Sequence, residues 1–165
     1  MSVLPLALAS CVIPPSLSVS EDAGVNSPPA ILSVSSDQVV LPEPGPVAFE
    51  IGGNTDLSVS LIDTDADDTL YVRIFVDYNS PDRLDARSKC TAGSGAARRT
   101  ATCNLRSLCA STDLDTQRNM TVVVFDRLPD DSGKGDPPFQ AMDVGSGGLS
   151  TSRFYFLKCQ RSSQQ

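Results

Sequence analysis

The clearest strand pattern in the chain lies in Leu57–Tyr78, which reads LSVSLIDTDADDTLYVRIFVDY. Apolar side chains alternate with serine at its start, and near its end one face carries Leu70, Val72, Ile74, Val76 and Tyr78. A period of two is the pattern of a β-strand, because successive side chains point to opposite faces. The stretch therefore predicts two strands joined by an acidic turn, residues 63–68.

Further short apolar runs, separated by turn residues, lie on both sides of this stretch. They predict strands at residues 30–36, 38–41, 47–51, 98–104, 119–127 and 152–159. The turn Gly52-Gly53-Asn54 tolerates positive φ, so it predicts a hairpin that leads into Leu57–Leu61. No internal repeat and no long helical periodicity is present. The regular spacing of strands predicts an all-β fold, an antiparallel sandwich of about seven strands.

The composition narrows the class of function. The chain has 165 residues, enough for one domain, with 13 basic and 20 acidic side chains and a net charge of −7. It contains no histidine, which excludes Ser-His-Asp and Cys-His nucleophiles and histidine-ligated metals. The acidic balance is unsuited to nucleic acid, because phosphate contacts need basic side chains. These features predict a protein that is not an enzyme and binds no nucleic acid.

The cysteines point to disulfides. Cys90, Cys103, Cys109 and Cys159 lie in the second half of the chain, without the close CxxC spacing of a zinc knuckle. Four cysteines allow three pairings, and the sequence alone selects none of them. We favour Cys90–Cys103, which closes a short Gly/Ser/Ala-rich segment, and Cys109–Cys159, which ties an inter-strand loop to the last strand. Two disulfides predict an oxidising compartment.

The fifth cysteine, Cys11, follows an apolar run that ends in Leu8-Ala9-Ser10-Cys11. This motif resembles the lipobox of bacterial lipoproteins, in which an aliphatic and two small residues precede the cysteine. The resemblance implies cleavage before Cys11 and lipid attachment to its thiol, and several acyl chains on one residue give stable anchoring. The sequence departs from a signal peptide in lacking a basic n-region and in having Pro5. We therefore expect the natural translation start upstream of Met1.

The domain organisation follows from these features. Residues 1–11 are interpreted as a signal remnant with its lipobox, and residues 12–28 as a flexible Ser/Pro-rich tether. Residues 29–159 are the predicted sandwich, and residues 160–165 a disordered tail. No run reaches the roughly 20 apolar residues that a transmembrane helix needs.

The segment Leu57–Tyr78 also resembles the region between the second and third strands of bacterial immunoglobulin-like, cadherin-like and PKD-like domains. Those domains often show an alternating strand, an Asp-x-Asp-x-Asp turn and a Leu-x-aromatic strand. The stretch Asn26-Ser27-Pro28-Pro29 is similar to the start of such modules. The resemblance implies an immunoglobulin-like fold in which Ile74 or Phe75 replaces the absent buried tryptophan. It implies no activity, since such sandwiches have many roles.

The acidic turn is the sharpest candidate for chemistry, because spaced carboxylates can bind calcium. Its candidate ligands are Asp63, Asp65, Asp67 and Asp68. An EF-hand is excluded, because Asp68 takes the glycine position and Ile74 the position of the bidentate glutamate. A cadherin-like site between loops is an alternative, with Asp113, Asp115, Asp130 or Asp131 as further ligands. The favoured interpretation is structural, with Asx-turns between two strands. Calcium is the one cofactor that the sequence leaves open.

Two other groups of residues have competing interpretations. Arg98, Arg99 and Arg106 are interpreted as a solvated face, with an anionic glycan or a lipid headgroup as the alternative ligand. Phe154, Tyr155 and Phe156 cannot all face inward, so at least one ring is expected at the surface. Packing in the core or at its edge is favoured over a contact surface for these rings.

The predicted function is that of a membrane-anchored extracytoplasmic lipoprotein with a non-catalytic structural or interaction role. Its partners would be the membrane, through acylated Cys11, and an envelope protein or glycan. Under the sorting pattern of bacterial lipoproteins, Val12 after the anchor implies the outer membrane of a host with two membranes. A calcium-dependent binding or adhesion module is the alternative function, and a carboxylate-based hydrolase is the third.

Overall fold

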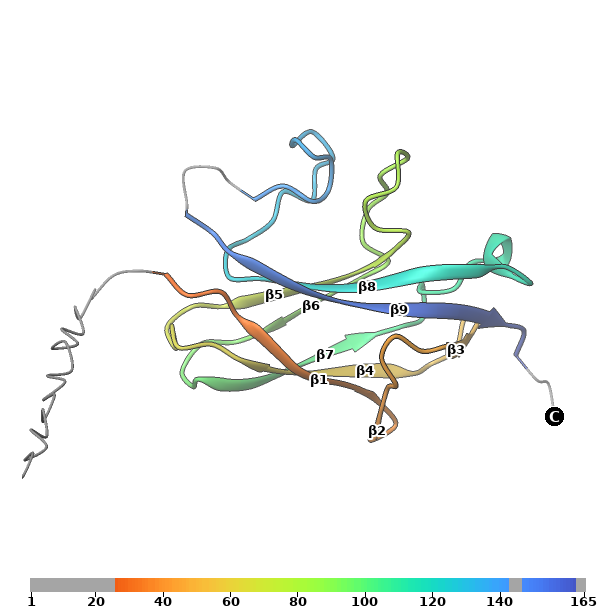
Figure 1. Cartoon of the computed structure of the whole chain (residues 1–165), viewed down its shortest axis with the longest axis horizontal. Helices are drawn as coiled ribbons and strands as arrows, with labels where there is room; N and C mark the ends of the chain where they lie inside the picture. Colours follow the sequence, from red (N-terminus) through yellow and green to blue (C-terminus); the bar gives the residue numbers. More distant parts are fainter. Residues whose placement is uncertain (1–25, 143–146, 163–165) are drawn as a thin grey trace, which may run out of the picture.

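The computed structural model describes residues 26–142 and 147–162. Within these ranges the fold is all-β, as predicted (Figure 1). The elements are β1 Ala30–Ser36, β2 Val39–Val40, β3 Val47–Glu50, β4 Asp56–Ile62, β5 Leu70–Val76, β6 Ser88–Ala92, β7 Arg98–Asn104, the 3₁₀ turn η1 Ser111–Asp113, β8 Gln117–Phe125 and β9 Ser150–Gln160. The lipobox with Cys11, most of the proposed tether and the end of the tail lie outside the described residues.

The strands form two sheets that together make a strongly curled half-barrel. One sheet has four strands in the order β2-β1-β4-β7, and the other has five in the order β3-β9-β8-β5-β6. The expectation of a purely antiparallel fold is wrong at one place, because β3 and β9 pair in parallel. The expected number of about seven strands is also too low for the described residues. The two-residue β2 is an edge strand, and β6 has no apolar run to mark it.

The predicted hairpin through Gly52-Gly53-Asn54 is wrong. β3 pairs with β9 in one sheet, whereas β4 pairs with β1 and β7 in the other. The turn therefore carries the chain from one sheet to the other. Val47 and Phe49 are buried on the inner side of β3, so both neighbouring strands face the same core from opposite sheets. The alternation of apolar and polar residues in β3 and β4 is compatible both with a hairpin in one sheet and with a turn that crosses between the sheets.

The main core lies between the sheets. Its fully buried side chains include Val34, Leu57, Val59, Leu61, Leu70, Val72, Ile74, Met120, Val122, Val124, Tyr155 and Leu157. Burial of each aliphatic side chain of this size contributes about 1.5–3 kcal/mol. The outer faces of β5 and β8 also carry apolar side chains, and Phe75, Val123 and Phe125 form a second cluster there. This second cluster is covered by the segments that follow β5 and β8, which contribute Tyr78 and Phe139.

Both favoured disulfide pairings are present. Cys90–Cys103 joins β6 to β7 and so links the two sheets, with a Cα–Cα distance of 5.1 Å. Cys109–Cys159 joins the loop after β7 to β9, with a Cα–Cα distance of 5.6 Å. The loops that they close correspond to about 3 and about 4 kcal/mol of chain entropy removed from the unfolded state. The two disulfides indicate an oxidising, extracytoplasmic location.

The described termini lie at opposite ends of the sheets (Figure 1). Asn26, the acidic turn and the end of β8 share one end, which we call the N-terminal end. The end of β5, the start of β8 and η1 share the other, which we call the far end. In the part of the chain described by the structure, no helix is long and apolar enough to span a membrane.

Candidate functional site

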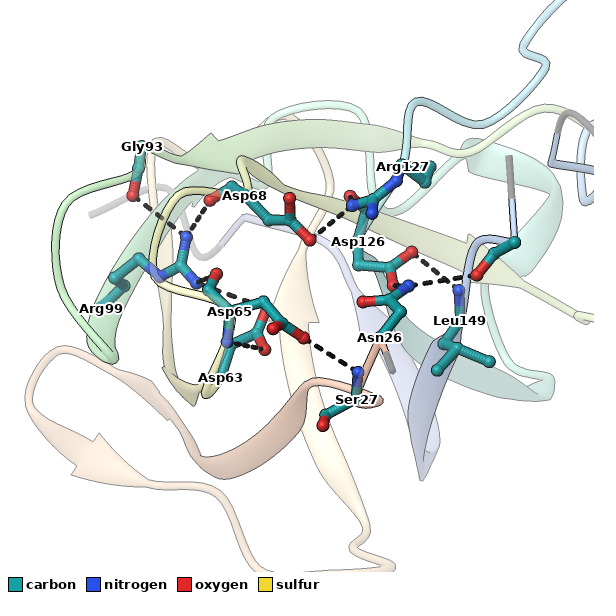
Figure 2. A network of polar contacts seen from close by, with 11 residues as sticks. Asn26, Ser27, Asp63, Asp65, Asp68, Gly93, Arg99, Asp126, Arg127 and Leu149 are labelled. Atoms are coloured by element: carbon teal, nitrogen blue, oxygen red, sulfur yellow. Dashed lines mark hydrogen bonds and ion pairs between the residues drawn. The ribbon is translucent and has the colours of Figure 1, made fainter. Parts of the chain in front are cut away.

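The acidic turn follows β4 at the N-terminal end, where it is part of a polar network (Figure 2). Asp63 is 2% exposed, and its Oδ1 accepts a hydrogen bond of 3.0 Å from the backbone N–H of Asp65. This is the Asx-turn that the structural interpretation predicted. The other carboxylate oxygen of Asp63 lies 3.3 Å from Nη2 of Arg99. The first acid of the turn is therefore used to shape the turn and to hold a buried cation.

Arg99 projects from β7 into the turn, and its side chain is 5% exposed. Its Nη1 donates to the carbonyl oxygens of Asp68 and Gly93, and its Nη2 donates to that of Asp65 at 3.2 Å. A guanidinium has five N–H donors in a planar fork, so one side chain can bond several carbonyls at once. Arg99 therefore ties the acidic turn to the β6–β7 turn.

The electrostatics of Asp63 reflect its burial. Loss of contact with water raises the pKa of its carboxyl group above the usual value. The Asp65 N–H and the Arg99 guanidinium act in the opposite direction without reversing the shift. The ionised form of Asp63 thus depends on Arg99, because a buried charge without a partner is costly.

Two further acids of the turn have partners of their own. Asp68 forms an ion pair with Arg127, and the hydrogen bond between them raises the pKa of the Arg127 guanidinium. Asp65 Oδ2 accepts a hydrogen bond of 2.9 Å from the backbone N–H of Ser27. Asp67 is exposed. Three of the four candidate calcium ligands are therefore engaged within the protein.

The same network holds the first described residues of the chain. The side-chain amide of Asn26 donates to Asp126 and, at 3.1 Å, to the carbonyl oxygen of Gly147. Asp126 in turn accepts a hydrogen bond of 2.7 Å from the backbone N–H of Leu149. Together with the bond from Ser27 to Asp65, these contacts fix the start of the domain against the loops at the N-terminal end (Figure 2).

The additional acids proposed for an inter-loop calcium site lie elsewhere. Asp113 is at the far end, where it pairs with Arg87 and Arg118. Asp131 lies in the loop after β8 and forms a bidentate contact with Arg73. Across residues 26–142 and 147–162, no three acidic or cysteine side chains are grouped so that they could hold a metal ion.

The buried Asp113 is a second charged centre that sequence reasoning did not identify as one. Its side chain is fully buried, and it accepts hydrogen bonds from Arg87 and from the backbone N–H of Ala110. Burial raises the pKa of its carboxyl group, but these bonds and the positive charge of Arg118 outweigh burial and hold the pKa below the usual value. The sequence signal was weak, because Asp113 is one of several acids in a polar stretch.

The three candidate arginines differ from one another in burial, and so do the three candidate aromatic residues. Arg99 is buried while Arg98 and Arg106 are exposed, so the three arginines do not share a solvated face. Tyr155 is fully buried, whereas Phe154 is 37% exposed and packs edge-on against Phe156 with ring centroids 5.0 Å apart. The expectation that one ring reaches the surface is confirmed.

Comparison with known proteins gives no family for this chain. A scan against models of protein families finds no match, and a search of curated proteins finds no significant relative. Its function must therefore be argued from its own residues.

Proposed function

We propose that the protein is a membrane-anchored extracytoplasmic lipoprotein whose β-domain has a non-catalytic interaction role. The lipobox Leu8-Ala9-Ser10-Cys11 supplies the anchor in this proposal. The two disulfides support the location, because such bonds persist in oxidising compartments. An outer-membrane position, suggested by Val12, is part of the same proposal.

The observation that carries the proposal is the fixed start of the domain. Asn26 and Ser27 are hydrogen-bonded to Asp126 and Asp65, so the chain leaves the domain from a defined place at the N-terminal end. An anchor some fifteen residues before Asn26 would then present the far end away from the membrane. The far end is then free of the tether and available to a partner in the envelope.

The strand order supports the finer assignment to an immunoglobulin-like sandwich. In that fold the first, second and fifth strands share one sheet, and the third, sixth and seventh share the other. The strands β1, β4 and β7 correspond to the first set, and β5, β8 and β9 to the second. Ile74 is fully buried on the inner face of β5, which suits it to the place of the missing tryptophan.

The alternative of a calcium-dependent module has no comparable support. Asp63 and Asp68 are paired with arginines, and Asp65 accepts the N–H of Ser27. A calcium ion would have to displace these partners. We therefore propose one function only.

The anchor is tested by the mass of the mature N-terminus. The gene, with its natural upstream sequence, is expressed in a bacterial host, and the membrane fraction is analysed by mass spectrometry. We expect an acylated Cys11 as the first residue, and release from the membrane in a Cys11→Ser variant. A protein that retains an unmodified Met1 and a free Cys11 would overturn the proposal.

A further inference from the structure

A polar cleft lies at the far end of the domain, between the loop after β5 and the start of β8. Its volume is about 580 Å³, within the range of small-molecule sites. The side chains on which the following inference depends are Asp77, Tyr78, Asn79, Asp82, Arg87 and Arg118. None of them belongs to the network at the N-terminal end.

The cleft is built from side chains that are held in place. Arg118 donates to Asp77 at 3.0 Å, and the other oxygen of Asp77 accepts the N–H of Asn119 at 3.1 Å. Buried Asp113 lies behind this surface and binds both Arg118 and Arg87. Fixed donors and fixed acceptors therefore stand side by side before any ligand arrives, which lowers the entropic cost of binding.

One of the residues that line the cleft, Tyr78, is aromatic. The ring of Tyr78 lies 5.0 Å from that of Phe75, which belongs to the cluster on the outer face of β5. Burial raises the pKa of the Tyr78 hydroxyl above its usual value, so this group is neutral and can both donate and accept a hydrogen bond. Tyr78 thus combines an apolar ring with a polar edge.

The charge of the cleft selects the class of ligand. Three aspartates and two arginines line it, which gives a net charge of −1. An anion would face Asp77 and Asp82, and a cation would face Arg87 and Arg118. An uncharged polyhydroxyl compound avoids both repulsions, because each hydroxyl can donate to a carboxylate and accept from a guanidinium.

We propose that this cleft binds a neutral oligosaccharide, whose hydroxyls bond the fixed polar groups and whose apolar ring face packs on Tyr78. The inference rests on the proposed interaction role and names its ligand class, but it does not depend on the lipid anchor. Arg118 is near the start of β8 and Asp126 directly follows its end, eight residues later, which corresponds to a separation of about 26 Å. The cleft is therefore remote from the point where the chain enters the domain.

The test is a titration of the oxidised full chain with three neutral oligosaccharides, followed by NMR shifts of backbone amides. The probes are the tetramers of β-1,4-linked N-acetylglucosamine, of β-1,4-linked glucose and of α-1,4-linked glucose. We expect saturable shifts from at least one of them, confined to residues 77–82, 87 and 112–119. Sodium phosphate and calcium chloride serve as the anionic and cationic probes and are expected to leave these amides unchanged.

Two variants and one matched control sharpen the test. Asn79→Gly removes the amide while keeping a residue that tolerates the local φ of 64°, and it is expected to weaken binding about fivefold, the effect of one hydrogen bond. Gln38→Gly makes the same kind of change at a φ of 66° in the β1–β2 turn and should not alter binding. Asp82→Asn replaces an exposed carboxylate of the cleft by a neutral amide, which accepts a hydroxyl hydrogen bond more weakly, so it is also expected to weaken oligosaccharide binding.

The outcomes separate this inference from the proposed anchor. No shift with any oligosaccharide, shifts confined to other residues, or a response to phosphate or calcium alone would each refute the cleft as a saccharide site. Equal affinities of the Asn79→Gly and Gln38→Gly variants would refute it as well. The mass of the mature N-terminus is independent of all these results, so an anchored protein without saccharide binding would remain a lipoprotein.

Discussion

Replacement of Arg99 by leucine is expected to lower the free energy of unfolding by about 3–5 kcal/mol at neutral pH, the usual cost of breaking a buried ion pair. Arg99 and Asp63 are almost completely buried, with 5% and 0% of their side chains exposed. The substitution removes the cation and leaves the Asp63 carboxylate without its charged partner. It also leaves the carbonyls of Asp65, Asp68 and Gly93 without this donor. Leucine fills part of the space but satisfies none of these groups.

The cost should depend on pH. Because Arg99 lowers the pKa of Asp63, its loss raises a pKa that burial has already raised. A carboxyl group whose pKa is higher in the folded than in the unfolded state destabilises the fold increasingly as pH rises through that window. The destabilisation by Arg99→Leu should therefore be largest at pH 7 and smaller near pH 4, where folded Asp63 takes up a proton.

Urea denaturation of the oxidised protein at pH 7 and pH 4 measures both effects. Arg98→Leu is the matched control, because Arg98 is the exposed neighbour on the same strand and its loss should change stability by less than about 0.5 kcal/mol. The double variant Arg99→Leu, Asp63→Asn should recover part of the stability at pH 7, since no buried charge remains. Equal losses for the Arg98 and Arg99 variants, or a loss for Arg99→Leu that does not change with pH, would refute the reasoning.

Three other substitutions test the Asp113 ion pairs, the second disulfide and the bond from Ser27 to Asp65. Asp113→Asn should cost about 1–3 kcal/mol at pH 7, because it weakens the bonds to Arg87 and to the Ala110 N–H, whereas Arg118 keeps its ion pair with Asp77. Because the folded pKa of Asp113 is lowered, its contribution is fully present above the unfolded pKa and is lost as pH falls from there through the folded pKa. In acid unfolding curves the difference between wild type and variant should therefore shrink as pH falls below the unfolded pKa. Replacing Cys109 and Cys159 by alanine should lower stability in urea by about 4 kcal/mol, and a change under about 1 kcal/mol would contradict the loop-closure argument. Asp65→Ala should cost about 1 kcal/mol and speed hydrogen exchange at the Ser27 amide, while unchanged exchange there would show that the bond to Asp65 does not hold the chain.

The local parts of the candidate site could be predicted from sequence, and the long-range parts could not. The Asx-turn at Asp63 depends on a residue two positions away, so its pattern is visible in the chain. The partner of Asp63 is Arg99, and nothing in the sequence marks this arginine as buried when its neighbour Arg98 is exposed. The cleft at the far end joins residues from three separate segments, which only the fold brings together.

The residue pattern of the chain predicts an all-β protein, and the number and spacing of its cysteines predict two disulfides. The alternation in β5 and the continuous apolar run in β8 identify strands because side-chain direction has a period of two along the backbone. The sequence did not reveal β6, because its residues Ser-Lys-Cys-Thr-Ala show almost no apolar pattern.

The pairing of the strands depends on the tertiary structure. β3 joins β9 in parallel and not β4 in a hairpin, although both arrangements would bury Val47 and Phe49. Hydrophobic burial is non-directional, so alternation shows that a face is buried but not against which strand. The ion pairs also depend on the tertiary structure. The arginines that neutralise Asp63 and Asp113 are brought to them by strands and loops that are distant in the sequence.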